Sequence, residues 1–95
     1  MQEEIHAAHI LVSTEKEADD ILEKLDEGEE FATLAYAYSK CPSKEEGGDL
    51  GWFGQGVMVP EFEHAAFTTK QGKYSKVKTE FGWHLIKILG TRDSE

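Results

Sequence analysis

The segment "GWHLIKIL", residues 82–89, decides what kind of fold this chain can adopt, because its side chains alternate between two faces. One face carries His84, Ile86 and Ile88, and the opposite face carries Trp83, Leu85 and Leu89. Alternation with a period of two residues is typical of a β-strand. The chain is therefore predicted to close on a strand of a sheet.

Other segments carry weaker versions of the same signal. "IHAAHILV", residues 5–12, is a short apolar run that stops at a Ser-Thr pair, as a strand buried on at least one face does. Residues 74–78 alternate weakly, and "LGWF", residues 50–53, resembles a brief strand. Four strands are expected.

Between the predicted strands at 5–12 and 50–53, apolar residues repeat at the spacing typical of helices. Thr14 and Glu17 form a capping box, and apolar residues then repeat at helical spacing until Gly28 offers a stop. A second amphipathic helix follows and ends near Ser39. The apolar positions of the two helices are Ala18, Ile21, Leu22 and Leu25, and then Phe31, Leu34, Ala35 and Tyr38.

Pro60 is suited to the first position of a third helix, where its fixed φ and missing N–H cost nothing. The segment that follows, "PEFEHAAF", places Phe62, Ala65 and Ala66 on one side. The expected order is strand, two helices, strand, helix, two strands. This order predicts an α+β fold in which helices cover a sheet.

Length and charge limit the possible functions. A chain of 95 residues has room for one domain, residues 1–95, and the formal net charge is -9. Residues 1–50 hold fourteen acidic side chains against four basic ones. Such a surface repels nucleic acids and anionic membranes, so neither is an expected partner, and it favours a monomer.

The cellular location is predicted from the cysteine count and from the distribution of apolar residues. Cys41 is the only cysteine, so the chain can form no internal disulfide, and no apolar stretch is long enough to span a membrane. The first residues lack the basic and apolar regions of an export signal. A cytoplasmic location is expected.

Residues 40–60 form an organised loop, because they break all periodicity and hold both prolines and five of the nine glycines. Within the longer stretch "GWFGQGVMVPEF", residues 51–62, glycines surround aromatic and apolar side chains that no neighbouring pattern buries. Two histidines, His9 and His84, lie inside predicted strands. A buried imidazole needs hydrogen-bond partners, and each histidine alone is better explained as a core residue bonded to backbone or solvent, unless the two strands are neighbours.

Three segments together resemble the parvulins, a family of peptidyl-prolyl cis/trans isomerases, and most closely their short bacterial-type members. They are "HILV" at 9–12, "CPSKEEGGDLGWFGQGVMVPEFEHAAF" at 41–67 and "VKTEFGWHLIKIL" at 77–89. The resemblance covers essentially the whole chain. It implies a four-stranded, mostly antiparallel sheet surrounded by helices, a parvulin/FKBP-like architecture with the first and last strands adjacent at its centre.

The resemblance also implies a pocket for the substrate proline ring. Met58 and Phe62 match two of its lining positions, Leu50 a third and Phe81 a fourth. From the residues alone, ordinary core packing explains Met58 and Phe62 as well, because apolar residues four apart are usually core. Glycines near them let the backbone approach a ligand without strain.

Four further residues match the family's catalytic positions. His9 and His84 fit its paired central histidines, Cys41 its cysteine or aspartate position, and Thr79 the hydroxyl residue that joins the histidine network. His6 and His64 match no functional position and are expected to be surface or structural residues.

The reaction needs no cofactor and no metal, because isomerisation breaks no bond. The two histidines are expected to orient and polarise a hydrogen-bond network without obligatory proton transfer. Covalent catalysis by Cys41 is disfavoured, because three acidic residues follow it closely and a thiolate gains from positive surroundings. The expected partners are proline-containing segments of client proteins. The alternative is a parvulin-like module that binds such segments without isomerising them.

The segment "STEKEADD", residues 13–20, bears on substrate choice. Phosphate-directed parvulins carry basic residues there, whereas this chain has only Lys16 between two glutamates. Phe81 also replaces a small hydroxyl residue of that type. We therefore expect apolar or basic residues before proline to be preferred, and phosphoserine or glutamate to be poor substrates.

Overall fold

A computed structural model of the chain describes residues 2–94. Its centre is one four-stranded sheet with the strand order β2-β1-β4-β3, in which every neighbouring pair is antiparallel. The strands are β1 (Gln2–Val12), β2 (Asp49–Phe53), β3 (Tyr74–Thr79) and β4 (Gly82–Ser94). The first and last strands are therefore neighbours at the centre, as the resemblance implied.

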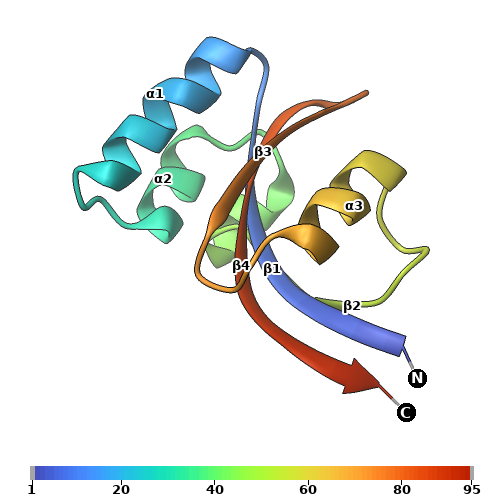
Figure 1. Cartoon of the computed structure of the whole chain (residues 1–95). Coiled ribbons are helices and arrows are strands. Elements are labelled where there is room, and N and C mark those ends of the chain that lie inside the picture. The colour runs from blue at the N-terminus through green and yellow to red at the C-terminus, as the bar shows by residue number, and fades with distance from the viewer. Residues whose placement is uncertain (1, 95) are drawn as a thin grey trace.

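Helices cover the two faces of this sheet, as Figure 1 shows. The helices α1 (Glu15–Asp26) and α2 (Phe31–Tyr38) lie on one side, and α3 (Pro60–Thr68) lies on the other. A short 3-10 helix, η1 (Pro42–Glu46), lies between α2 and β2. The predicted α+β class and the element order are confirmed. The 3-10 helix is an addition that no periodic pattern in the sequence predicts.

Two apolar clusters follow from the alternation of the central strands. The first cluster packs α1 and α2 on one face of the sheet, and its strand residues include Ile10, Val12 and Leu85. The second packs α3 on the opposite face, and its strand residues include Ile86 and Ile88. The two faces that the segment at 82–89 predicts thus become two cores, one under each layer of helices.

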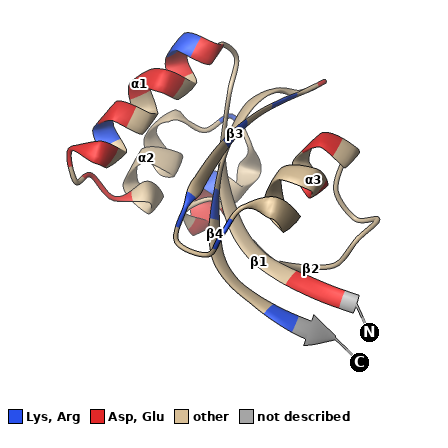
Figure 2. Cartoon of the chain, in the orientation of Figure 1, with Lys and Arg blue, Asp and Glu red and all other residues tan. Residues whose placement is uncertain are grey.

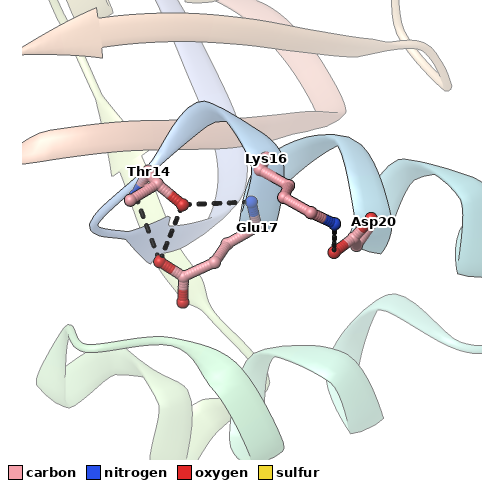
Figure 3. A network of polar contacts seen from close by, with 4 residues as sticks. All are labelled: Thr14, Lys16, Glu17 and Asp20. Carbon is pink, nitrogen blue, oxygen red and sulfur yellow. Dashed lines mark hydrogen bonds and ion pairs between the residues drawn. The ribbon is translucent and has the colours of Figure 1, made fainter.

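The start of α1 depends on the predicted capping box. The Thr14 hydroxyl accepts a hydrogen bond from the Glu17 backbone N–H at 3.2 Å, and the Glu17 carboxylate accepts one from the Thr14 N–H at the same distance (Figure 3). Lys16 and Asp20 add an ion pair one turn apart. These contacts begin the helix soon after β1, with only Ser13 and Thr14 between the strand and α1.

The two central strands extend beyond their predicted ends. The sequence predicts strands at 5–12 and 82–89, whereas β1 begins at Gln2 and β4 continues to Ser94. The added residues are mostly polar and so show no apolar alternation. They are held by the backbone ladder between the two strands, with an Arg92–Glu4 ion pair across it at 2.8 Å.

Acidic and basic residues are unevenly distributed over the molecule. Figure 2 shows the acidic residues gathered along α1 and lysines along β3. Lys76 of β3 joins the two by binding Glu15 at 2.8 Å and Asp19 at 2.7 Å. Part of the acidic charge of α1 is thus compensated within the fold.

Candidate functional site

Strand pairing brings His9 and His84 together from opposite ends of the chain. His9 is paired with Ile86, and His84 is paired with Leu11, so the two histidines are diagonal neighbours on the face covered by α3. Their Nδ1 atoms lie 3.0 Å apart and their rings are stacked with an interplanar angle of 17°. Both side chains are buried. The two histidines therefore form a pair, which neither position in the sequence could indicate alone.

Two glycines allow the backbone around these histidines to pack closely. The Gly48 carbonyl accepts the His9 N–H at 2.9 Å, and a Cβ atom at Gly48 would collide with the His9 carbonyl oxygen. Gly82, at the start of β4, has a φ of +136°, and a Cβ atom there would collide with the Val12 carbonyl oxygen. Only glycine fits both positions without moving a central strand.

Thr79 extends the pair into a chain of hydrogen bonds. Its Oγ1 lies 2.7 Å from His84 Nε2 and accepts the Phe81 backbone N–H at 3.2 Å. If the Thr79 hydroxyl donates to His84 Nε2, the His84 proton lies on Nδ1 and is donated to His9 Nδ1. This assignment leaves the fewest buried polar groups without a partner. The proton of His9 then lies on Nε2, which has no hydrogen-bond partner among the described residues.

Burial keeps both imidazoles neutral. Loss of solvation, together with a smaller effect of the nearby His84, lowers the pKa of His9 to about 4. Burial likewise lowers the pKa of His84. Near neutral pH neither ring carries a charge, so the pair can form hydrogen bonds but holds no imidazolium proton to release.

A largely apolar cavity of about 440 Å³ opens beside this pair. Its lining combines strand, loop and helix residues that are distant in sequence: His9, Leu11, Lys40, Cys41, Pro42, Leu50, Val57, Met58, Val59, Phe62, Phe81 and His84. All four residues expected to contact a proline ring are among them. The structure thus places the expected pocket next to the expected histidines.

Phe62 joins the cavity to the histidine pair. Its ring meets His9 edge-on with the centroids 5.5 Å apart, and meets His84 in the same manner at 5.3 Å. Phe62 and Met58 also belong to the core under α3, where Phe62 is buried and Met58 is partly buried. Core packing and pocket lining, the two explanations that the sequence left open for these residues, therefore both apply.

Cys41 lies on the cavity wall but outside the hydrogen-bond chain. It is the N-cap residue of η1, is partly buried, and its backbone N–H donates to Ser39 Oγ at 3.3 Å. Within residues 2–94 its thiol makes no hydrogen bond to either histidine. The structure thus brings three of the four expected catalytic residues into one network and leaves Cys41 at its edge.

Searches among known proteins agree on one family. Residues 1–92 match the family described as the PPIC-type PPIase domain. The chain belongs to this family of peptidyl-prolyl isomerase domains. The foldase protein PrsA of Geobacillus sp. (strain WCH70) is 56% identical over 93 residues, which cover 96% of this chain and 34% of that protein.

Solved structures show the same relationship. The PrsA crystal structure from Bacillus anthracis matches with a TM-score of 0.95 and 49% identity over 99% of this chain and 44% of the other. The solution structure of NmPin, the parvulin of Nitrosopumilus maritimus, matches with a TM-score of 0.85 and 46% identity over 93% and 97% of the two chains. The parvulin resemblance is thus confirmed, and the chain spans about a third of the length of its PrsA relatives.

Five residues line the cavity of this PPIase domain without having been expected from the sequence. They are Leu11, Lys40, Pro42, Val57 and Val59. Leu11 could have been found, because strand alternation places it on the same face as His9. Val57 is 66% exposed, although it is apolar. It lies in the glycine-rich loop, where no periodic pattern predicts the direction of its side chain.

The other two histidines lie away from the cavity. His6 Nε2 lies 2.8 Å from Asp49 Oδ1, and its ring packs against Trp52. His64 is exposed on α3. Within residues 2–94 no three His, Cys, Asp or Glu side chains gather as metal ligands do, and no helix is long and apolar enough to cross a membrane.

Proposed function

We propose that this chain catalyses cis/trans isomerisation of peptide bonds that precede proline in flexible or unfolded protein segments, by a non-covalent mechanism. The observation that carries the proposal is the apolar cavity that Phe62 joins to a buried, neutral pair of histidines. The family to which the chain belongs supports the same activity.

The task is to lower a rotation barrier of roughly 18–20 kcal/mol, which exists because amide resonance makes the C–N bond partly double. The Met58 and Phe62 side chains can hold the proline ring in the cavity while the preceding carbonyl leaves water. Loss of water around that carbonyl weakens the resonance, since the charge-separated form is less well solvated. The apolar lining is therefore the main source of catalysis in this proposal.

The histidine pair supplies a preorganised polar group beside that lining. Both rings are neutral, and rotation about the peptide bond requires no proton to be moved, so the pair acts through hydrogen bonds and orientation. The Nε2 atom of His9 has no partner within the described residues, so it has capacity for one hydrogen bond when the site rearranges around a substrate. Thr79 fixes the tautomer of the pair from its far end.

Substrate choice follows from the charges near the cavity. Among residues 2–94, Lys40 is the one acidic or basic residue, apart from the two neutral histidines, that lines the cavity, and the lining includes no arginine. A phosphate group is typically bound by clustered or bidentate cations, so we propose that this domain does not depend on phosphorylation. The acidic helix α1 packs on the face of the sheet opposite the cavity. Its acidic residues therefore repel anionic substrates less than they would if α1 lay beside the cavity.

The natural clients are proposed to be unfolded proteins, as the name foldase given to the PrsA relatives suggests for those proteins. A monomeric state and a cytoplasmic location, which were expected from the charge and composition, remain predictions. Sedimentation and cell fractionation would test them.

A protease-coupled assay on a short peptide with leucine before proline tests the proposal. Faster conversion of the cis form in the presence of the chain is the expected result. Binding of the peptide with no change in the rate of conversion would instead favour a module that holds proline segments without isomerising them.

A further inference from the structure

The loop between β2 and α3, residues 54–59, supplies a wall of the cavity. Three consecutive residues of this loop, Val57, Met58 and Val59, line the cavity, and Pro60 then begins α3. The loop has no regular secondary structure between Gly54 and Val59. Its position must therefore be set by a few specific contacts.

One carboxylate holds the middle of this loop. The Gly56 backbone N–H donates a hydrogen bond to Glu63 Oε1 at 2.6 Å. Among residues 2–94, this is the one side-chain hydrogen bond made to residues 54–58. A hydrogen bond to an ionised carboxylate is among the stronger kinds in proteins. Gly56 has a φ of +89°, a conformation that favours glycine there.

Glu63 makes a second contact to the same loop through its backbone. Its N–H donates to the Val59 carbonyl at 2.9 Å, which is the first hydrogen bond of α3. The residue thus binds the loop at Gly56 and at Val59, on the two sides of Met58. The residue before it, Phe62, carries the ring that meets both histidines.

We infer that Glu63 is a positioning residue that holds the Met58 wall of the cavity against Phe62 and thereby sets the affinity for the proline ring. The inference rests on the proposed isomerase function. Glu63 does not line the cavity, so its carboxylate acts through the loop and not by contact with the substrate.

The chain offers a matched control two residues earlier. Glu61 lies in the same first turn of α3, is exposed, and makes no side-chain hydrogen bond within the described residues. Glu61→Ala therefore removes the same charge near the same helix N-terminus without releasing the loop. Glu63→Gln keeps an oxygen that can accept from Gly56, whereas Glu63→Ala removes the acceptor.

The test measures kcat and KM separately on the leucine peptide. Glu63→Ala is expected to raise KM about three- to tenfold with kcat changed less than about twofold, because the loosened Met58 wall holds the proline ring less tightly while Phe62 and the rest of the apolar lining stay in place. Glu63→Gln should keep most of the affinity, and Glu61→Ala should match the wild type. Amide hydrogen exchange should show faster exchange at Gly56 in Glu63→Ala alone.

A double-variant cycle with Met58→Ala separates a positioning role from a general effect on the fold. If Glu63 acts through Met58, Glu63→Ala should change KM little once the Met58 side chain is already absent. Additive effects of the two substitutions, or an equal loss in Glu61→Ala, would overturn the inference. An inactive wild-type chain would contradict the proposed function itself, and the exchange at Gly56 would still report whether the loop is held.

Discussion

The Nδ1 atoms of His9 and His84 face each other at 3.0 Å across the two central strands, in a region that excludes water from both rings. Two neutral imidazoles at this distance share one proton between their Nδ1 atoms, and a further proton would place a positive charge where both rings are shielded from water. Burial thus favours the neutral pair.

The neutral pair predicts a specific dependence of stability on pH. The pKa of His9 is about 4 in the folded chain, against 6.5 when unfolded, so the unfolded state binds more protons between these values. The contribution of neutral His9 to the free energy of unfolding should be fully present above pH 6.5. The free energy of unfolding should then fall by about 3 kcal/mol as the pH drops to about 4. Urea titrations at several pH values measure it.

His9→Asn serves as the comparison for this measurement, because asparagine does not titrate. Its free energy of unfolding should change less over the same range of pH. Parallel curves for the two proteins would mean that acidic groups elsewhere cause the whole loss and that His9 is not held neutral by the fold.

Truncating the cavity wall should reduce activity more than stability. Met58→Ala removes apolar contacts to the proline ring and should cost on the order of 1–3 kcal/mol of transition-state stabilisation, read from kcat/KM. Phe62→Ala should lose as much, but Phe62 is also a buried core residue, so thermal melts must show that the variant is folded.

Phe67→Ala is the matched control for these two substitutions. Phe67 lies on α3 and packs on the same core, but does not line the cavity. It should lower the melting temperature while kcat/KM of the folded protein stays near the wild-type value. Full activity in a folded Met58→Ala, Phe62→Ala double variant would show that the proline ring binds elsewhere.

Much of this site could be predicted because its parts lie in periodic or recognisable segments. Alternation at 82–89 predicts the direction of His84, and Pro60 predicts the start of the helix that carries Phe62. Contact between His9 and His84 could not be predicted from periodicity, because it depends on which strands are neighbours and on their register. The resemblance to parvulins supplied that adjacency.

The loop residues were harder to predict for a different reason. Gly54–Val59 has no period, so nothing in the sequence indicates that Val57 lines the cavity or that Glu63 reaches back to Gly56. Likewise, the sequence predicts the capping box and helix that begin in the segment at 13–20, but it does not indicate that this helix packs on the face opposite the cavity. Local patterns predict elements, but the layer on which an element packs depends on the whole sheet.

Two substitutions at Cys41 separate its possible roles. Cys41→Asp keeps a hydrogen-bond acceptor on the cavity wall, whereas Cys41→Ala removes it, and neither retains a nucleophilic sulfur. We expect aspartate to retain more of the isomerase rate than alanine, as measured in the protease-coupled assay. Equal and complete loss in two folded variants would point to chemistry that only a thiol can perform.

Peptides of the form Ala-X-Pro-Phe test the predicted substrate class. Turnover should be highest with leucine at X and lower with glutamate or phosphoserine. Phe81, 63% exposed, adds apolar surface that favours leucine, and within the described residues the cavity lining offers a single lysine, Lys40, where phosphate binding typically needs clustered cations. The ranking should change little with added salt, since the acids of α1 lie across the sheet. Faster turnover of phosphoserine than of leucine would reverse this assignment.

Exchange NMR on the leucine peptide at equilibrium measures isomerisation most directly, because it needs no coupling protease and detects both directions of rotation. With a small molar fraction of the chain present, the cis and trans signals should exchange within about a second, against tens to hundreds of seconds without it. Met58→Ala should slow the catalysed exchange. Unchanged exchange in the presence of folded wild-type chain that binds the peptide would contradict isomerase activity at this cavity.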